Sequence, residues 1–156
     1  MHQRAEEFAR AARERYGYDV EVHEFPEGTK TAADAADAIG CSVSQIASSL
    51  VFIADEDPVI VVTSGANRVD ESRLAAKLGA ASVRMAEPDE AREATGWSIG
   101  GVPPFCHDQE LRVLVDDTLL GHEEVWAAAG TPKGVFPIDP DRLVEIANAE
   151  PAGVAT

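Results

Sequence analysis

The chain contains the sequence Ile46-Ala47-Ser48-Ser49-Leu50-Val51-Phe52-Ile53, followed shortly by Val59-Ile60-Val61-Val62. The second run is apolar throughout, which is typical of a strand that is covered on both faces. Between the two runs, three acidic residues and Pro58 make a polar break of the kind that turns contain. The pair of runs therefore predicts two strands joined by a turn within a covered sheet.

Helical patterns lie on both sides of these strands. Residues 3–16 carry apolar side chains at helical spacing with charged residues opposite. Further helices are expected where a capping residue precedes an apolar pattern, at Thr31, Asp70, Pro88 and Asp139. Short extended segments are expected at residues 20–25, 82–85, 111–115, 124–128 and 135–138.

The order of these segments fits one domain, since strands and helices mix without an internal repeat, a linker or a low-complexity block. We expect a single domain over residues 1–150 of the α/β (α+β) class, with a mixed β-sheet flanked by helices. Residues 151–156 are small and are expected to form a frayed C-terminal tail.

The charge balance of the 156 residues is strongly acidic. Asp and Glu number 28 against 13 Lys and Arg, which gives a formal net charge of −15, and the acids are spread along the whole chain. Such a surface repels nucleic acid and anionic membranes at low salt. Only Lys30, Lys77 and Lys133 are lysines. An even, lysine-poor acidic surface suggests a halophilic protein that works at very high salt, where charges are strongly screened.

The two cysteines, Cys41 and Cys106, form no Cys-x-x-Cys pair and are too few for a disulfide framework. They are expected to be reduced thiols of a cytosolic protein. No signal peptide precedes the first helical pattern, and no apolar run approaches the length needed to span a membrane. The expected location is therefore cytoplasmic.

A loop rich in glycine and proline separates two regular segments: Gly96-Trp97-Ser98-Ile99-Gly100-Gly101-Val102-Pro103-Pro104-Phe105-Cys106-His107. The paired glycines at 100 and 101 allow a ligand to approach the main chain, while the paired prolines fix the exit of the loop. Such a bend can bind an anion or a polarised carbonyl with its amides. The alternative is a tight loop that only turns the chain.

Standard catalytic and metal-binding motifs are missing from the sequence. The four histidines show no metal-ligand spacing with cysteine or acid, so no metal and no cofactor is expected. Cys106-His107 allows a cysteine nucleophile as an alternative, although side chains of adjacent residues diverge. Polar residues recur where strands and turns end, as ligand sites in α/β sheets do. They include Thr31, Ser48, Asn67, Arg68 and the Gly130-Thr131 turn.

Five segments, read in order, resemble the YbaK/prolyl-tRNA-synthetase-associated family of stand-alone aminoacyl-tRNA editing domains. They are Thr31-Ala32-Ala33-Asp34-Ala35-Ala36, Gln45-Ile46-Ala47-Ser48-Ser49-Leu50-Val51-Phe52, Ser64-Gly65-Ala66-Asn67-Arg68-Val69-Asp70, Gly100-Gly101-Val102-Pro103-Pro104-Phe105 and Val125-Trp126-Ala127-Ala128-Ala129-Gly130-Thr131-Pro132. The resemblance covers residues 20–147, almost the whole chain, and any single segment is weaker than the five in register.

The resemblance implies a mixed sheet flanked by helices and a trans-acting hydrolase that cleaves the ester of mischarged tRNA. Such enzymes supply discrimination that a synthetase pocket cannot achieve for side chains of similar size. The backbone amides of Gly100 and Gly101 would hold the substrate carbonyl and the developing oxyanion. A hydroxyl of the terminal ribose would position the water.

The same resemblance implies the binding residues and the partners. The acceptor end of aminoacyl-tRNA is the expected partner, an aminoacyl-tRNA synthetase is a second candidate, and no membrane contact is expected. The residues expected to bind substrate are Thr31, Ser48, Asn67, Arg68, Pro103, Phe105, Gly130 and Thr131. Alanyl, cysteinyl, seryl and threonyl esters all remain open as substrates.

Two positions depart from the family pattern. Ser48 stands where members commonly carry a lysine that contacts the terminal nucleotide, and Arg68 or Lys30 would have to supply that charge. Cys106 stands where a glycine usually follows Pro-Phe. The missing lysine leaves an alternative open: a non-catalytic protein of the same fold that binds aminoacyl-tRNA or a nucleotide.

Overall fold

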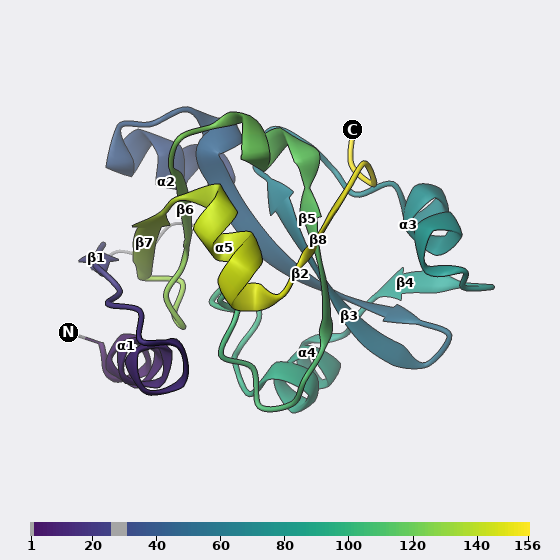
Figure 1. Cartoon of the computed structure of the whole chain (residues 1–156), viewed down its shortest axis with the longest axis horizontal. Helices are drawn as coiled ribbons and strands as arrows, with labels where there is room; N and C mark the ends of the chain where they lie inside the picture. The colour runs from purple at the N-terminus through teal and green to yellow at the C-terminus, as the bar shows by residue number, and fades with distance from the viewer. Residues whose placement is uncertain (1, 26–30) are drawn as a thin grey trace.

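The computed structural model describes residues 2–25 and 31–156, and the positions 26–30 that contain Pro26, Gly28 and Lys30 lie outside it. Over the described residues the chain forms one mixed sheet of eight strands with five α-helices packed against it (Figure 1). The strand order is β1-β7-β6-β2-β3-β5-β8, and β4 pairs with β2. The predicted fold class is confirmed.

The two apolar runs form an antiparallel hairpin at the centre of the sheet. β2 spans Ile46–Ala54 and β3 spans Asp57–Ser64, with Ala47 opposite Ser64 and Ala54 opposite Asp57. Both faces of β3 are covered as predicted. Ile60 and Val62 are fully buried in one apolar cluster, while Val61 is fully buried in another.

The remaining strands extend the sheet on either side of the hairpin. β5 (Arg112–Asp116) runs parallel to β3, and β8 (Glu150–Ala152) runs parallel to β5. On the other side β6 (Val125–Ala128) runs parallel to β2, followed by antiparallel β7 (Gly134–Ile138) and β1 (His23–Glu24). The extended segment expected over residues 20–25 is therefore only a two-residue strand.

The edge of β2 that faces away from β3 pairs with two different strands, β6 and β4, which leave a gap between them. β6 pairs with Ile46 and Ala47 only, while β4 (Val83–Met85) pairs with residues 52–54. Among the described residues, positions 48–50 of β2 therefore have a strand partner on one side only. The sheet is split at this point, and the split forms the cavity described below.

The helices begin and end where the capping residues predict. α1 spans Gln3–Tyr16, α2 Ala32–Ile39, α3 Glu71–Leu78, α4 Pro88–Thr95 and α5 Pro140–Ala147. The Thr31 hydroxyl accepts a hydrogen bond from the Asp34 amide at 3.1 Å, and Asp70 accepts from the first turn of α3. Two short 3₁₀ helices, Val43–Gln45 and Asp117–Gly121, complete the described elements. None of the described helices is long and apolar enough to cross a membrane.

The last residues of the chain are ordered, so the expectation of a frayed tail over residues 151–156 is wrong. Ala152 and Val154 are buried, and Val154 packs in the cluster that covers one face of the sheet. The backbones of Arg68 and Thr156 exchange two hydrogen bonds of 2.8 Å. A proline-containing strand of three residues fits the outermost place in the sheet, where a missing N–H costs no ladder bond.

Candidate active site

A cavity of about 450 Å³ lies beside β2, where its edge is left unpaired between β6 and β4. It is bounded by the first turns of α2, by residues 46–50 of β2, by the loop at Ile99, Gly100 and Val102, and by the turn from β6 to β7. None of the described residues that line it carries a charge. The cavity therefore presents hydroxyl and backbone groups to a ligand, and its described lining residues supply no acid or base.

The Gly100 amide is a hydrogen-bond donor available at the cavity wall. Gly100 has a φ of +88°, a left-handed conformation that glycine adopts without strain, and its amide has no hydrogen-bond partner among the described residues. The Gly101 amide, in contrast, donates to the Ser98 carbonyl at 3.0 Å. Gly101 thus uses its N–H to close the turn, and of the two amides Gly100 is the one without a partner among the described residues; their role toward an oxyanion stays a prediction.

Gly101 and Gly130 are required for steric reasons, since a side chain would not fit at either position. A Cβ on Gly101 would be 2.8 Å from the Thr131 Cα, and one on Gly130 would be 2.6 Å from the Trp97 ring. Carbon atoms in real structures do not approach so closely. Gly101 therefore lets the loop pack against the backbone of Thr131 in the β6–β7 turn, and Gly130 lets that turn pack against the Trp97 ring and the Arg4 carbonyl.

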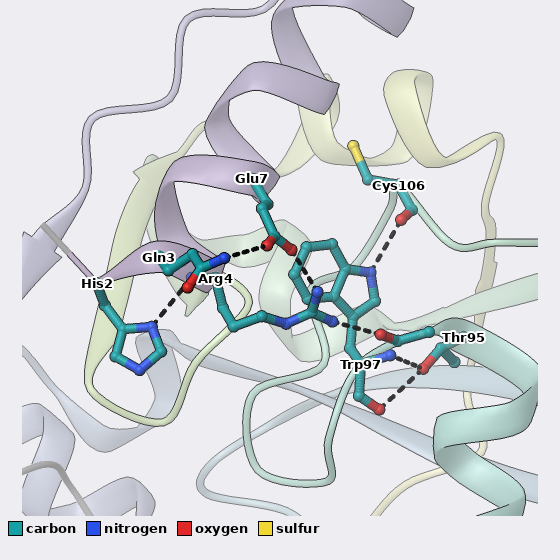
Figure 2. Close-up of polar contacts among 8 residues, drawn as sticks. His2, Gln3, Arg4, Glu7, Thr95, Trp97 and Cys106 are labelled. Carbon is teal, nitrogen blue, oxygen red and sulfur yellow. Dashed lines mark hydrogen bonds and ion pairs between the residues drawn. The ribbon is translucent and has the colours of Figure 1, made fainter.

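The loop is held from behind by Trp97 and Arg4 (Figure 2). The Trp97 indole N–H donates to the Cys106 carbonyl at 2.9 Å, and the Arg4 guanidinium lies 4.1 Å above the indole ring. Arg4 also donates to the Gly96 carbonyl and to the Glu7 carboxylate. Both ends of the loop are thus tied to one indole ring and to α1, which pre-organises the Gly100 amide.

Ser48 and Ser49 both line the β2 wall of the cavity, and the structure adds Ser49 to the binding residues that were predicted from the sequence. The Ser49 hydroxyl is buried and has no hydrogen-bond partner in the described structure. Buried hydroxyls are normally paired, so an unpaired one on a cavity wall points to a ligand partner. Two serines interrupting an otherwise apolar strand were the available signal.

Cys106 and His107 face away from this cavity and border a second one of about 340 Å³. Cys106 is only 4% exposed, and burial raises the pKa of its thiol to about 11. The buried His107 ring donates from Nε2 to the Pro103 carbonyl at 2.8 Å, and burial lowers its pKa. A thiol with such a pKa is protonated at neutral pH, so the structure does not support the cysteine-nucleophile alternative.

The cavity gathers Thr31, Ser48, Gly100 and Thr131 from the predicted binding and catalytic residues. The structure places the others elsewhere. Pro103 and Phe105 are buried, and Phe105 packs among the rings of Phe8, Tyr16, Tyr18 and Phe136.

Asn67 and Arg68 lie outside the cavity, in the loop before α3. The Asn67 side chain donates to the buried Asp116 carboxylate at 3.0 Å and to the Thr118 hydroxyl at 2.8 Å. Asp116 also accepts from the Ser64 amide at 3.0 Å. Asn67 thus joins strand ends to the following loops, and Arg68 is exposed beside the last residue of the chain.

Aromatic and aliphatic side chains at the rim were also missed by sequence reasoning. Trp126 lines the cavity and meets the His23 ring edge-on, with centroids 5.0 Å apart. Ile99 lines it too and is 47% exposed. In residues 2–25 and 31–156, no three His, Cys, Asp or Glu side chains lie close enough together to hold a metal ion.

Sequence comparison finds relatives that share most of the chain. The aminoacyl-tRNA editing domain family matches residues 26–146. The uncharacterized protein YwhH of Bacillus subtilis (strain 168) is 37% identical over 128 residues, which cover 80% of each chain. The proline--tRNA ligase of Ligilactobacillus salivarius (strain UCC118) is 37% identical over 87 residues, covering 56% of this chain and 15% of the ligase.

Structural comparison agrees with the sequence relatives. A crystal structure described as a proposed trans-editing enzyme for prolyl tRNA synthetase superimposes with a TM-score of 0.94 at 38% identity. The superposition covers 100% of this chain and 99% of the other. The mixed sheet with its neutral cavity is therefore the fold of a trans-editing protein. The chain belongs to the aminoacyl-tRNA editing domain family, and the resemblance seen in the sequence is confirmed.

Proposed function

We propose that this protein is a trans-acting aminoacyl-tRNA deacylase, a hydrolase that removes a wrong amino acid from tRNA in translation quality control. The family and the structural neighbour support this role. The observation that carries it is the unpaired, left-handed Gly100 amide on the wall of a neutral cavity. A preorganised amide of this kind stabilises the charge that develops on an ester carbonyl.

The reaction begins when the aminoacyl ester enters the cavity and its carbonyl oxygen accepts the Gly100 N–H. Water adds to the carbonyl carbon, negative charge develops on that oxygen, and the ester C–O bond breaks to leave the ribose hydroxyl and a free amino acid. By the family resemblance, a ribose hydroxyl of the substrate would position the water, which agrees with a described lining that contains no titratable residue. Losing one oxyanion donor costs roughly 10²–10³ in rate.

Hydroxyl groups along the cavity would orient the bound ester. Thr31, Ser48 and Thr131 line the cavity together with the unpaired Ser49 hydroxyl. A hydroxyl both donates and accepts, so these groups can bind the ammonium and the ribose of the substrate without a charge of their own. Gly101 and Gly130 would maintain the shape in which these contacts form.

The test is deacylation of a panel of mischarged tRNAs in multimolar KCl by the wild-type protein and by Gly100→Ala. The substitution places a side chain at the left-handed position beside the donor, and we expect a fall of about 10²-fold in kcat. Gly79→Ala is the matched control, because Gly79 also has a positive φ (+68°) and open space around it, but lies outside the cavity.

The alternative is a non-catalytic protein that binds aminoacyl-tRNA, which the uncharged Ser48 position favours. Binding of aminoacyl-tRNA by the folded wild type without turnover of any species would establish that alternative. Turnover of one species that Gly100→Ala loses and Gly79→Ala retains would establish the deacylase and name its substrate.

A further inference from the structure

We propose that Lys133 is the residue that binds the phosphate of the terminal nucleotide at the mouth of the cavity. The inference rests on the proposed function in one respect only, namely that the ligand is the acceptor end of an RNA. Its ligand class is a nucleotide phosphate held by a single ammonium group.

The first step is the charge of the cavity itself. Its described lining residues carry no charge, so any cation that meets a phosphate has to lie at the rim. The chain as a whole carries −15, which repels a polyanion from most of its surface. A cation at the rim is therefore the feature that would let a phosphate approach.

The second step is a census of the cations. Of the thirteen Lys and Arg residues, Lys30 lies outside the described part of the chain. Seven of the others contact a carboxylate: Arg4, Arg13, Arg73, Lys77, Arg84, Arg112 and Arg142. Their charge is partly neutralised before any ligand arrives.

The third step is the location of the five that remain. Arg10 and Arg15 lie on α1, and Arg15 borders the second cavity, where it donates to the His107 carbonyl. Arg92 lies on α4 and Arg68 in the loop before α3. Of these five, Lys133 is the one whose neighbours along the chain, Thr131, Pro132 and Gly134, line the first cavity.

The fourth step is the rigidity of the turn that presents Lys133. The Lys133 amide donates to the Thr131 hydroxyl at 3.3 Å, and the Gly134 amide donates to the Thr131 carbonyl at 3.2 Å. The Phe25 amide donates to the Lys133 carbonyl at 2.7 Å. The backbone of this exposed lysine is therefore fixed, while its ammonium group is free of any carboxylate partner in the described structure.

The test measures binding of an uncharged RNA minihelix ending in CCA between 0.1 and 1 M KCl. We expect Lys133→Gln to weaken binding about three- to tenfold at the lowest salt and to reduce the salt slope by about 0.7 to 0.9. Lys133→Arg should restore most of the affinity. Arg92→Gln is the control, since it makes the same change of charge at another exposed, unpaired cation.

A second measurement separates this inference from the proposed function. Adenosine aminoacylated on its ribose has no phosphate, so Lys133→Gln and wild type should cleave it at equal rates. If the wild type cleaves no ester, the deacylase proposal fails and the minihelix titration still decides on Lys133. Equal losses in Lys133→Gln and Arg92→Gln, or no minihelix binding by the wild type, would overturn the phosphate site.

Discussion

Cys106 has a backbone φ of +67°, in the left-handed region that favours glycine, at the position where the family resemblance leads one to expect a glycine. The sequence revealed the departure but not its cost, because φ depends on how the loop closes around Trp97. A side chain other than Asn, Asp or Gly in this region costs about 1 kcal/mol or more. The thiol is buried in the main apolar cluster, so packing offsets part of that strain.

The free energy of unfolding of Cys106 variants should therefore fall as the new side chain grows from Gly to Ala to Val. We expect Cys106→Gly to lie within about 1 kcal/mol of wild type, because relief of strain offsets the lost packing. Cys106→Ala keeps the strain and loses the sulfur, and Cys106→Val adds a branched side chain, which should cost about 2–4 kcal/mol. Urea unfolding measures the series, and an alanine variant more stable than the glycine variant would contradict the strain argument.

Ser49 and Thr63 each bury a hydroxyl without a partner in the described structure, but only Ser49 lines the cavity. An unpaired buried hydroxyl costs about 1–3 kcal/mol, so Ser49→Ala and Thr63→Val should both leave the fold as stable as wild type or more stable. Deacylation should separate them. We expect Ser49→Ala to lower kcat/KM about tenfold and Thr63→Val to leave it unchanged, as measured on the mischarged tRNA that the wild type cleaves.

The elements of this fold follow from local signals to a large extent. Thr31 and Asp70 cap their helices as the sequence predicts, and Gly79 and Gly96 end theirs in the left-handed conformation that glycine favours. Pairing between distant strands has no such local signal. The split beside β2 arises because β6 contributes two residues to that edge and β4 contributes three, and neither number is written in either strand.

The candidate site divides in the same way. Gly100 and Thr131 belong to loops whose glycines identify them in the sequence, and both lie at the cavity. Asn67 looks the same as a sequence position, but its amide is occupied by Asp116, which is 49 residues away along the chain. Hydrogen bonds of that range depend on the finished sheet, so residue type alone could not separate a ligand contact from a structural one.

β8 and the residues that follow it pack on the sheet, contrary to the frayed end expected from the sequence. Val154 is 2% exposed beside Leu74 and Leu114, and Val154→Ala should cost about 1–3 kcal/mol of unfolding free energy. Thr156→Ala is the control, because that side chain is exposed and should change stability by less than about 0.5 kcal/mol. Equal stability of Val154→Ala and Thr156→Ala would mean that residues 151–156 fray in solution.

The folded molecule carries a formal net charge of −15, and repulsion between like charges destabilises the compact state. We expect the free energy of unfolding to rise by about 2 kcal/mol between 0.1 M and multimolar KCl, or roughly 4–8 °C in Tm. The variant Asp37→Asn/Glu93→Gln/Glu123→Gln removes three exposed carboxylates that have no described partner. It should be more stable at low salt and less dependent on salt, and identical salt curves would exclude self-repulsion as the cause.

The residues that support the glycine loop lie outside the segment that the family model matches. The editing-domain match begins at residue 26, whereas Arg4 on α1 lies over the Trp97 indole (Figure 2). Phe8, also on α1, meets the same ring edge-on. A fragment trimmed to the matched residues would keep every described wall of the cavity and lose α1, whose Arg4 and Phe8 contact Trp97. The segment that the family model matches is therefore shorter than the part of the chain that supports the cavity.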